Sequence, residues 1–207
     1  MEDVASSGKQ ADQDELAGRI LAAVVAVIAE DGFEGATIRR VAARARCSAG
    51  AVQKRFATRT QLLRATFEHV VATVVERMRA AADGPGAGDD TLVAQQRIAA
   101  LQTLPLDDER RSESLVWISY LLRAAVDESL CDIPLNLDRA VRDALVHDLA
   151  AARAHGGLRS EANPAELADA LLALVDGIAI RMLYTPPAEH AALVAALDLA
   201  LEALLPT

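Results

Sequence analysis

The chain has 207 residues, 30 acidic and 21 basic, for a formal net charge of −9. This length allows one large or two small domains with a buried core. Two cysteines, Cys47 and Cys131, are too few for a disulfide framework, and neither has metal-ligand spacing to a histidine. We therefore expect reduced thiols, no metal and no cofactor.

Ala and Leu are abundant, aromatic residues make up 3%, and strand-like alternation is rare. This pattern predicts an all-α fold of about nine helices.

The N-terminal segment combines a polar tail with an apolar helix. Residues 1–13 are small and polar, which predicts a disordered tail. We expect Asp12 to cap a first helix that ends near Asp31, with Gly32 as its stop. The apolar run Ile20–Ala29 resembles the core of a secretory signal, but acidic residues precede it and it is too short to span a membrane. The sequence thus predicts a buried helix in a cytoplasmic protein without a membrane anchor.

Residues 37–56 have the pattern of two short helices joined by a tight turn. Thr37 and Ser48 are both suited to cap a helix N-terminus. Apolar residues at helical spacing mark an inner face on each helix: Ile38, Val41 and Ala42 on the first, Val52 and Phe56 on the second. Only residues 45–47 separate the helices, which favours a steep crossing. The segment is predicted to form a helix-turn-helix.

The basic residues of this region are segregated from acidic ones. Between Gly35 and Phe67 there is no Asp or Glu, and the basic residues are Arg39, Arg40, Arg44, Arg46, Lys54, Arg55, Arg59 and Arg64. On an acidic chain, such a patch lets one face approach a phosphate backbone. A solvated basic face without a partner is the alternative. The coincidence with two capped helices favours DNA binding.

Three strings carry a family resemblance: Glu30-Asp31-Gly32-Phe33, Thr37 to Ala42, and Ser48 to Phe56. Together they resemble the N-terminal domain of TetR-family transcriptional regulators, while Leu104–Ala125 resembles the C-terminal domain of BetI-like members. The resemblance implies a three-helix DNA-binding domain over residues 14–74 and a helical ligand-binding and dimerisation domain over 75–207. It further implies a homodimeric repressor that binds a palindromic DNA operator and is released by a small-molecule inducer.

The second helix of the motif is predicted to enter the major groove. The amide of Gln53 is suited to read adenine, and Lys54 to reach guanine or phosphate. Arg46 stands where the family usually has Gly, so a left-handed backbone there would cost on the order of 1 kcal/mol or more. Cys47 is expected to be a buried, inert thiol. The predicted DNA-contacting residues are Thr37, Arg46, Ser48, Ala49, Gly50, Ala51, Gln53, Lys54, Arg55 and Arg59.

Beyond the motif the sequence predicts long helices separated by breaks rich in Gly and Pro. Thr58 and Gln61 have capping-box spacing, and the helix they start is expected to run to about Ala82, into the second domain. A flexible loop is predicted at 83–90. The further helices are expected near residues 89–103, 107–127, 135–155, 163–184 and 187–205.

The last two predicted helices carry more apolar residues than one face can bury, which favours a dimer interface over the central helices of a monomer. The candidate interface residues are Leu167, Leu171, Val175, Ile178, Leu193, Leu197 and Leu201. A ligand pocket is the second hypothesis for this domain, with Glu113, Trp117, Tyr120 and Arg123 as candidate lining residues, although aromatic residues at this spacing are more often plain core.

Two other functions were compared with DNA-binding regulation. A helical small-molecule sensor or carrier without a DNA role leaves the acid-free basic segment unexplained. An enzyme is not supported, because the sequence shows no nucleophile beside a base, no phosphate-binding Gly loop and no recognisable pair of catalytic carboxylates.

Overall fold

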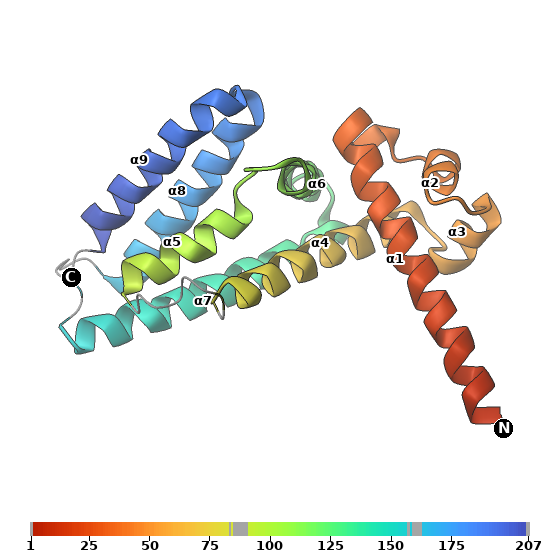
Figure 1. Cartoon of the computed structure of the whole chain (residues 1–207), viewed down its shortest axis with the longest axis horizontal. Coiled ribbons are helices and arrows are strands. Elements are labelled where there is room, and N and C mark those ends of the chain that lie inside the picture. The colour runs from red at the N-terminus through yellow and green to blue at the C-terminus, as the bar shows by residue number, and fades with distance from the viewer. Residues whose placement is uncertain (1, 83, 85–90, 157, 159–162, 206–207) are drawn as a thin grey trace. The chain divides into compact units, whose positions relative to one another are not determined.

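The structure is a computed structural model of the chain and describes residues 2–82, 84, 91–156, 158 and 163–205, with side chains from Gln13 onward (Figure 1). In this part the regular elements are all helical, which confirms the predicted fold class. They are α1 (Glu2–Gly35), α2 (Ile38–Arg44), α3 (Ala49–Arg55), α4 (Arg59–Ala82), α5 (Leu92–Thr103), α6 (Asp108–Ala124), η1 (Glu128–Leu130), α7 (Asp132–Ala154), α8 (Pro164–Tyr184), η2 (Pro187–Glu189) and α9 (His190–Leu204).

The helices form two compact units. Unit 1 comprises the chain up to Val71 together with Leu115–Leu130, and unit 2 comprises Ala72–Ser114 and the chain from Cys131 onward. The sequence-based division at residue 74 places residues 115–130 in the second domain, whereas they cluster with unit 1, where Trp117 and Tyr120 stack on Phe67 of α4. Because α4 and α6 each contribute residues to both units, two continuous helices connect them.

Unit 1 is built around the inner faces of α1 and the first part of α4. Ile20, Val24 and Phe67 have essentially no exposed surface, and α2 packs against both α1 and α3. Gly32 has φ of 72° and ψ of 178° and interrupts α1, as its predicted role as a helix stop requires. The three residues after Gly32 redirect the chain toward α2.

The N-terminal end differs from the expectation. Helix α1 begins at Glu2 and is continuous through the segment expected to be a disordered tail, so Asp12 lies inside the helix and is not its N-cap. Met1 lies outside the described residues. The segment contains no proline, the residue that most strongly disfavours a helix interior. A low content of apolar residues in this segment is therefore not sufficient to exclude a helix.

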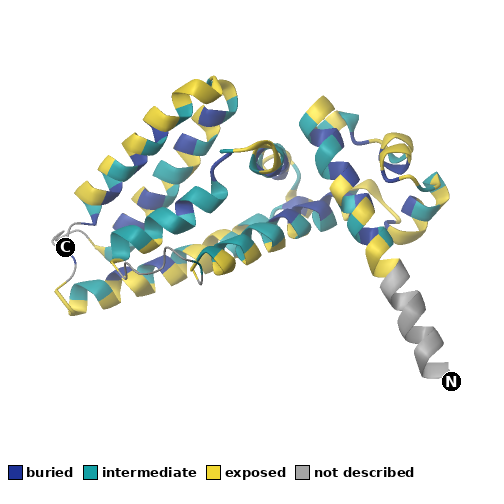
Figure 2. Ribbon diagram, in the orientation of Figure 1, coloured by how far each residue is buried: buried dark blue, intermediate teal, exposed yellow. Residues whose placement is uncertain are grey.

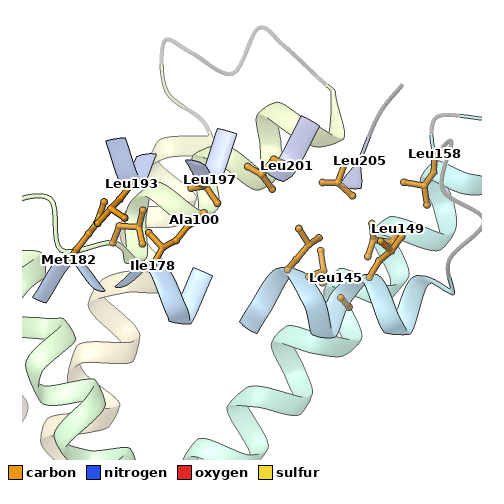
Figure 3. Close-up of a cluster of buried hydrophobic side chains, with 14 residues drawn as sticks. Ala100, Leu145, Leu149, Leu158, Ile178, Met182, Leu193, Leu197, Leu201 and Leu205 are labelled. Carbon is orange, nitrogen blue, oxygen red and sulfur yellow. The ribbon is translucent and has the colours of Figure 1, made fainter. Parts of the chain in front are cut away.

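Unit 2 has a leucine-rich core contributed mainly by α5, α7, α8 and α9 (Figure 3). In this core α7 packs on α8, and α9 packs on both α8 and α5. Two forked ion pairs lie beside it: the Nε of Arg97 is 2.6 Å from Oδ1 of Asp198, and the Nε of Arg142 is 2.5 Å from Oδ1 of Asp169. Each pair joins neighbouring helices of this unit.

Helix boundaries in unit 2 follow local capping chemistry. The side chains of Thr91 and Asn163 accept hydrogen bonds from the backbone N–H groups of Ala94 and Ala165 and start α5 and α8. Helix α7 starts at Asp132, three residues before the expected position, with Pro134 in its first turn. Proline is tolerated there because a first-turn N–H has no intrahelical acceptor. The loop predicted at 83–90 lies outside the described residues except for Gly84.

Candidate nucleic-acid interface

The turn between α2 and α3 is held by local hydrogen bonds that the sequence pattern anticipates. Thr37 accepts a bond from the N–H of Arg40, and Ser48 accepts one from the N–H of Ala51. After α2, the Cys47 N–H donates to the Ala42 carbonyl at 3.0 Å and the Arg46 N–H to the Ala43 carbonyl at 3.3 Å. These two bonds form a Schellman motif, in which the residue after the cap is left-handed.

That left-handed residue is Arg46, with φ of 53°, a conformation that the family's usual glycine at this position adopts without steric cost. The Cβ of a non-glycine residue makes this conformation unfavourable by on the order of 1–2 kcal/mol. Arg46 is exposed, and Cys47 beside it is half-buried where a buried thiol was expected. The fold therefore retains a locally strained, positively charged turn.

Helix α3 separates an inner from an outer face. Val52 is fully buried and Phe56 is 9% exposed, whereas Gln53 and Lys54 are exposed. Gly50 is also exposed and the two alanines on either side of it are half-buried. The outer face thus presents an amide, an ammonium group and small residues that allow close backbone approach, which is the set predicted to contact base edges.

Half of the eight basic residues are paired with carboxylates from α1. The structure pairs Arg40 with Asp31, Arg44 with Glu30 at 2.7 Å, Arg55 with Asp14 at 3.7 Å and Arg59 with Glu34 at 3.2 Å. These pairs are not apparent from the acid-free segment itself, because every one of the acidic partners lies before Gly35. The patch is therefore less cationic than the sequence of the segment indicates.

Three exposed cations of the motif have no carboxylate partner among residues whose side chains the structure describes. They are Arg39 on α2, Arg46 in the turn and Lys54 on α3. Because no internal anion compensates them, these groups are the ones most available to phosphate oxygens.

The start of α4 is fixed to the elbow after α1. The Thr58 hydroxyl accepts from the N–H of Gln61, and the Gln61 side chain accepts from the N–H of Ala57, a capping box shifted back by one residue. Arg59, predicted to contact phosphate, donates to the Phe33 carbonyl at 2.8 Å and to Glu34, and lies over the Phe33 ring. In the free protein Arg59 is thus engaged by its own chain.

One residue outside the motif also contacts the turn. Nη2 of Arg19 on α1 donates to the Ala45 carbonyl at 2.9 Å and to the Arg46 carbonyl at 3.4 Å. The role of Arg19 is not apparent from the sequence, because its acceptors are backbone oxygens 26 and 27 residues away along the chain. Only a tertiary contact reveals it.

The candidate pocket residues are divided between the two units, with Glu113 in unit 2 and Trp117, Tyr120 and Arg123 in unit 1. Trp117 and Tyr120 stack on Phe67, with ring centroids 5.0 and 4.2 Å away, so they belong to the core of unit 1, the alternative that the sequence had left open. Arg123 is half exposed, with its Nε 3.9 Å from Oδ2 of Asp127. A helical spacing places such residues on one side of a helix but does not decide what covers that side.

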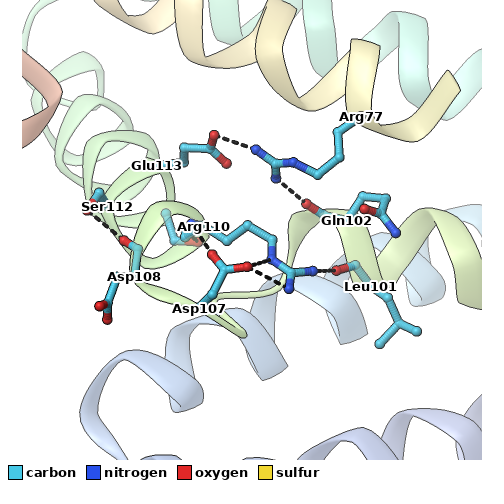
Figure 4. A network of polar contacts seen from close by, with 9 residues as sticks. Arg77, Leu101, Gln102, Asp107, Asp108, Arg110, Ser112 and Glu113 are labelled. Atoms are coloured by element: carbon cyan, nitrogen blue, oxygen red, sulfur yellow. Dashed lines mark hydrogen bonds and ion pairs between the residues drawn. The ribbon is translucent and has the colours of Figure 1, made fainter. Parts of the chain in front are cut away.

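Glu113 instead forms part of a buried polar network in unit 2 (Figure 4). Its carboxylate lies 2.5 Å from Nη2 of Arg77, and Nη1 of Arg77 donates to the Gln102 carbonyl. Nearby, both the N–H and the Nε of Arg110 donate to Asp107, the residue before α6. This network joins α4 to α6 within unit 2, as the aromatic stack does within unit 1.

The predicted dimer-interface residues lie mainly inside the monomer. Six of the seven are at most 5% exposed, namely Leu167, Leu171, Ile178, Leu193, Leu197 and Leu201, and Val175 packs against the same core. In the single chain these large side chains fill the core of unit 2. Both helices alternate buried and exposed positions along their length (Figure 2). Besides charged residues, each helix exposes a stripe of small or apolar residues at helical spacing: Ala173, Gly177, Ile180 and Tyr184 on α8, and Ala192, Ala196, Leu199 and Ala203 on α9.

Comparison with known proteins agrees with this architecture. The family model for the C-terminal region of BetI-type transcriptional repressors matches residues 96–206, and that for bacterial regulatory proteins of the tetR family matches residues 20–66. The chain belongs to the TetR family. BetI from Burkholderia mallei is 30% identical to this TetR-family chain over 169 residues, 79% of each protein. PksA from Bacillus subtilis is 26% identical over 185 residues, 86% of this chain and 83% of the relative.

Solved structures show the same fold. A transcriptional regulator from Rhodococcus sp. Rha1 superposes with a TM-score of 0.78 at 31% identity, covering 91% of this chain and 95% of the other. A regulator from Saccharomonospora viridis in complex with choline has a TM-score of 0.78 at 19% identity, covering 92% and 95%. By its family matches, this TetR-family protein is a ligand-responsive DNA-binding transcriptional regulator. Within the described residues, no helix has the length and apolarity needed to cross a membrane.

Proposed function

We propose that this regulator is a cytoplasmic homodimeric repressor that reads a palindromic operator with α3 and is released by a small-molecule inducer. The observation that carries the proposal is the division of α3: Val52 and Phe56 are turned into the core, while Gln53 and Lys54 are exposed beside the strained turn at Arg46. A helix anchored in this way can present its outer side chains to a major groove.

The proposed dimer uses the outer stripes of α8 and α9. Along α8 the exposed stripe falls at positions 173, 177, 180 and 184, and along α9 at 192, 196, 199 and 203. Both follow the spacing of a single helix face. Small residues let helices approach closely, and Ile180, Tyr184 and Leu199 are respectively 47%, 72% and 69% exposed in the monomer. A two-fold axis through this face pairs four helices and presents two copies of α3 to a symmetric site.

The proposed coupling between inducer and DNA uses α4 and α6, which both belong to the two units. The Arg77–Glu113 pair holds these helices together in unit 2, and the stack of Trp117 and Tyr120 on Phe67 holds them together in unit 1. An inducer that binds one arrangement of these helices better than another shifts the population toward it. The sole tryptophan lies in the stack and reports on it.

The first test is selection of operator DNA from random duplexes, followed by binding measurements at two salt concentrations. A repressor of the proposed kind enriches an inverted repeat and binds it more tightly than an unrelated duplex of equal length, with affinity falling as salt rises. Recovery of no preferred sequence, or of a site without two-fold symmetry, contradicts the proposal. Compounds that stabilise the protein thermally and change Trp117 fluorescence are then tested for release of that duplex.

A further inference from the structure

We infer that Arg19 is a positioning residue for operator recognition, acting through the strained turn at Arg46. The inference rests on the proposed role of α3 as the reading helix. Arg19 lies on α1, outside the helix-turn-helix motif, and its guanidinium donates to the carbonyls of Ala45 and Arg46. Both acceptors belong to the segment that sets the direction of α3 relative to α2.

The left-handed backbone at Arg46 is unfavourable, so hydrogen bonds from outside the turn are needed to stabilise it. Arg46 is the one non-glycine residue with positive φ in the described part of the chain. The local Schellman bonds stabilise the turn, but the left-handed conformation remains unfavourable for a residue with a Cβ. A charged guanidinium donating to two successive carbonyls stabilises it further, because hydrogen bonds from charged donors are the stronger class.

Arg19 is also placed so that its effect reaches the outer face of α3. Ala45 is 5% exposed, so its backbone is fixed in the core of unit 1, and Ser48 caps α3 only two residues after Arg46. A change in the turn therefore reorients α3 together with Gln53 and Lys54. Only the fraction of molecules with a correctly oriented α3 binds the operator with full affinity.

The test measures binding of four proteins to the selected operator duplex and to an unrelated duplex of equal length: wild type, Arg19→Met, Arg46→Gly and the double variant. Arg19→Met is expected to lose roughly tenfold or more in operator affinity. Its affinity for the unrelated duplex and the salt dependence of operator binding should stay near wild type, because Arg19 orients α3 and does not neutralise a phosphate. Arg79→Met, which removes a charge at an exposed position on α4, controls for a general electrostatic effect.

The double variant separates positioning from simple destabilisation. Glycine adopts the left-handed conformation without a steric penalty, so Arg19→Met should cost clearly less operator affinity when residue 46 is glycine. An equal loss in both backgrounds, or a flatter salt dependence for Arg19→Met, overturns the inference. Should Arg19→Met fail to fold by circular dichroism, Arg19→Lys, which keeps the charge but lacks the fork of donors, is measured in the same two backgrounds and decides by the same criterion. A wild-type protein that selects no operator contradicts the proposed function itself.

Discussion

A charge at Leu199 tests the proposed dimer face most directly. Leu199 lies in the middle of the exposed stripe of α9 and is 69% exposed in the monomer. In the proposed four-helix interface this side chain becomes buried against the partner. Leu199→Glu places a carboxylate there, and two-fold symmetry introduces the substitution twice in each dimer.

The expected magnitude follows from the exposed fraction. Full burial of a leucine side chain contributes about 1.5–3 kcal/mol, so burying roughly two-thirds of it contributes about 1–2 kcal/mol per protomer. Two copies give about 2–4 kcal/mol, which raises the dimer dissociation constant by roughly 30- to 1,000-fold. Desolvation of the two carboxylates adds to this effect.

Sedimentation velocity over a range of protein concentrations measures the shift, and circular dichroism confirms that the helices persist. Leu122→Glu is the matched control, because Leu122 is also 69% exposed but lies on α6. We expect Leu199→Glu to be monomeric at concentrations where wild type and Leu122→Glu are dimeric. A dimer of unchanged stability in Leu199→Glu refutes the α8–α9 face, as does equal dissociation in both variants.

The same reasoning predicts a different outcome at Leu197, which has no exposed surface. A polar residue at this position disrupts the core of unit 2 at a cost of several kcal/mol. Leu197→Glu should therefore lower the melting temperature or unfold the protein, whereas Leu199→Glu should leave a folded monomer. A folded Leu197→Glu monomer that melts like the wild type contradicts the assignment of this residue to the intrachain core.

Two further predictions concern base readout and acid stability. Gln53→Ala should reduce discrimination at one base position of each half-site by roughly 5- to 150-fold, while non-specific affinity stays nearly constant; an unchanged selected sequence excludes the readout role. The N–H of Arg110 and then its side chain hold the pKa of Asp107 below its ordinary value. This carboxylate therefore stabilises the fold above the unfolded pKa of about 4, and the contribution disappears as pH falls through the lower folded pKa. Asp107→Ala should lose stability relative to wild type at pH 7, with the difference shrinking below about pH 4. A constant difference across pH argues against the ionic cap.

Local chemistry made much of the DNA-binding unit predictable. Thr37, Ser48 and Thr58 act within three residues of their own positions, so the sequence contains both partners of each capping bond. The resemblance to a family that usually has Gly at this position raised the question of a left-handed backbone at Arg46, and φ there is positive. The fold class and these motif boundaries required no tertiary information.

Contacts between distant segments were not predictable from spacing. The acceptors of Arg19 and the carboxylate of Glu34 that binds Arg59 are more than 20 residues away from their partners. The α8–α9 pair posed a related difficulty, because each helix has a stripe of large apolar residues and a stripe of small ones. Helical periodicity detects both stripes, but only packing against α5 and α7 decides which of them lies inside the monomer.

The carboxylates of α1 change the expected salt dependence of DNA binding. If all eight basic residues neutralised phosphates, the slope of log affinity against log salt would be about −7 per protomer. An arginine already paired with a carboxylate contributes little to this slope, because the carboxylate it leaves recruits a cation in exchange for the one released from DNA. Arg39, Arg46 and Lys54, which lack such a partner among the described side chains, correspond to a slope near −3 per protomer. We therefore expect a measured slope nearer −3 than −7 per protomer, and a slope near −7 would contradict the inference that the four paired arginines contribute little.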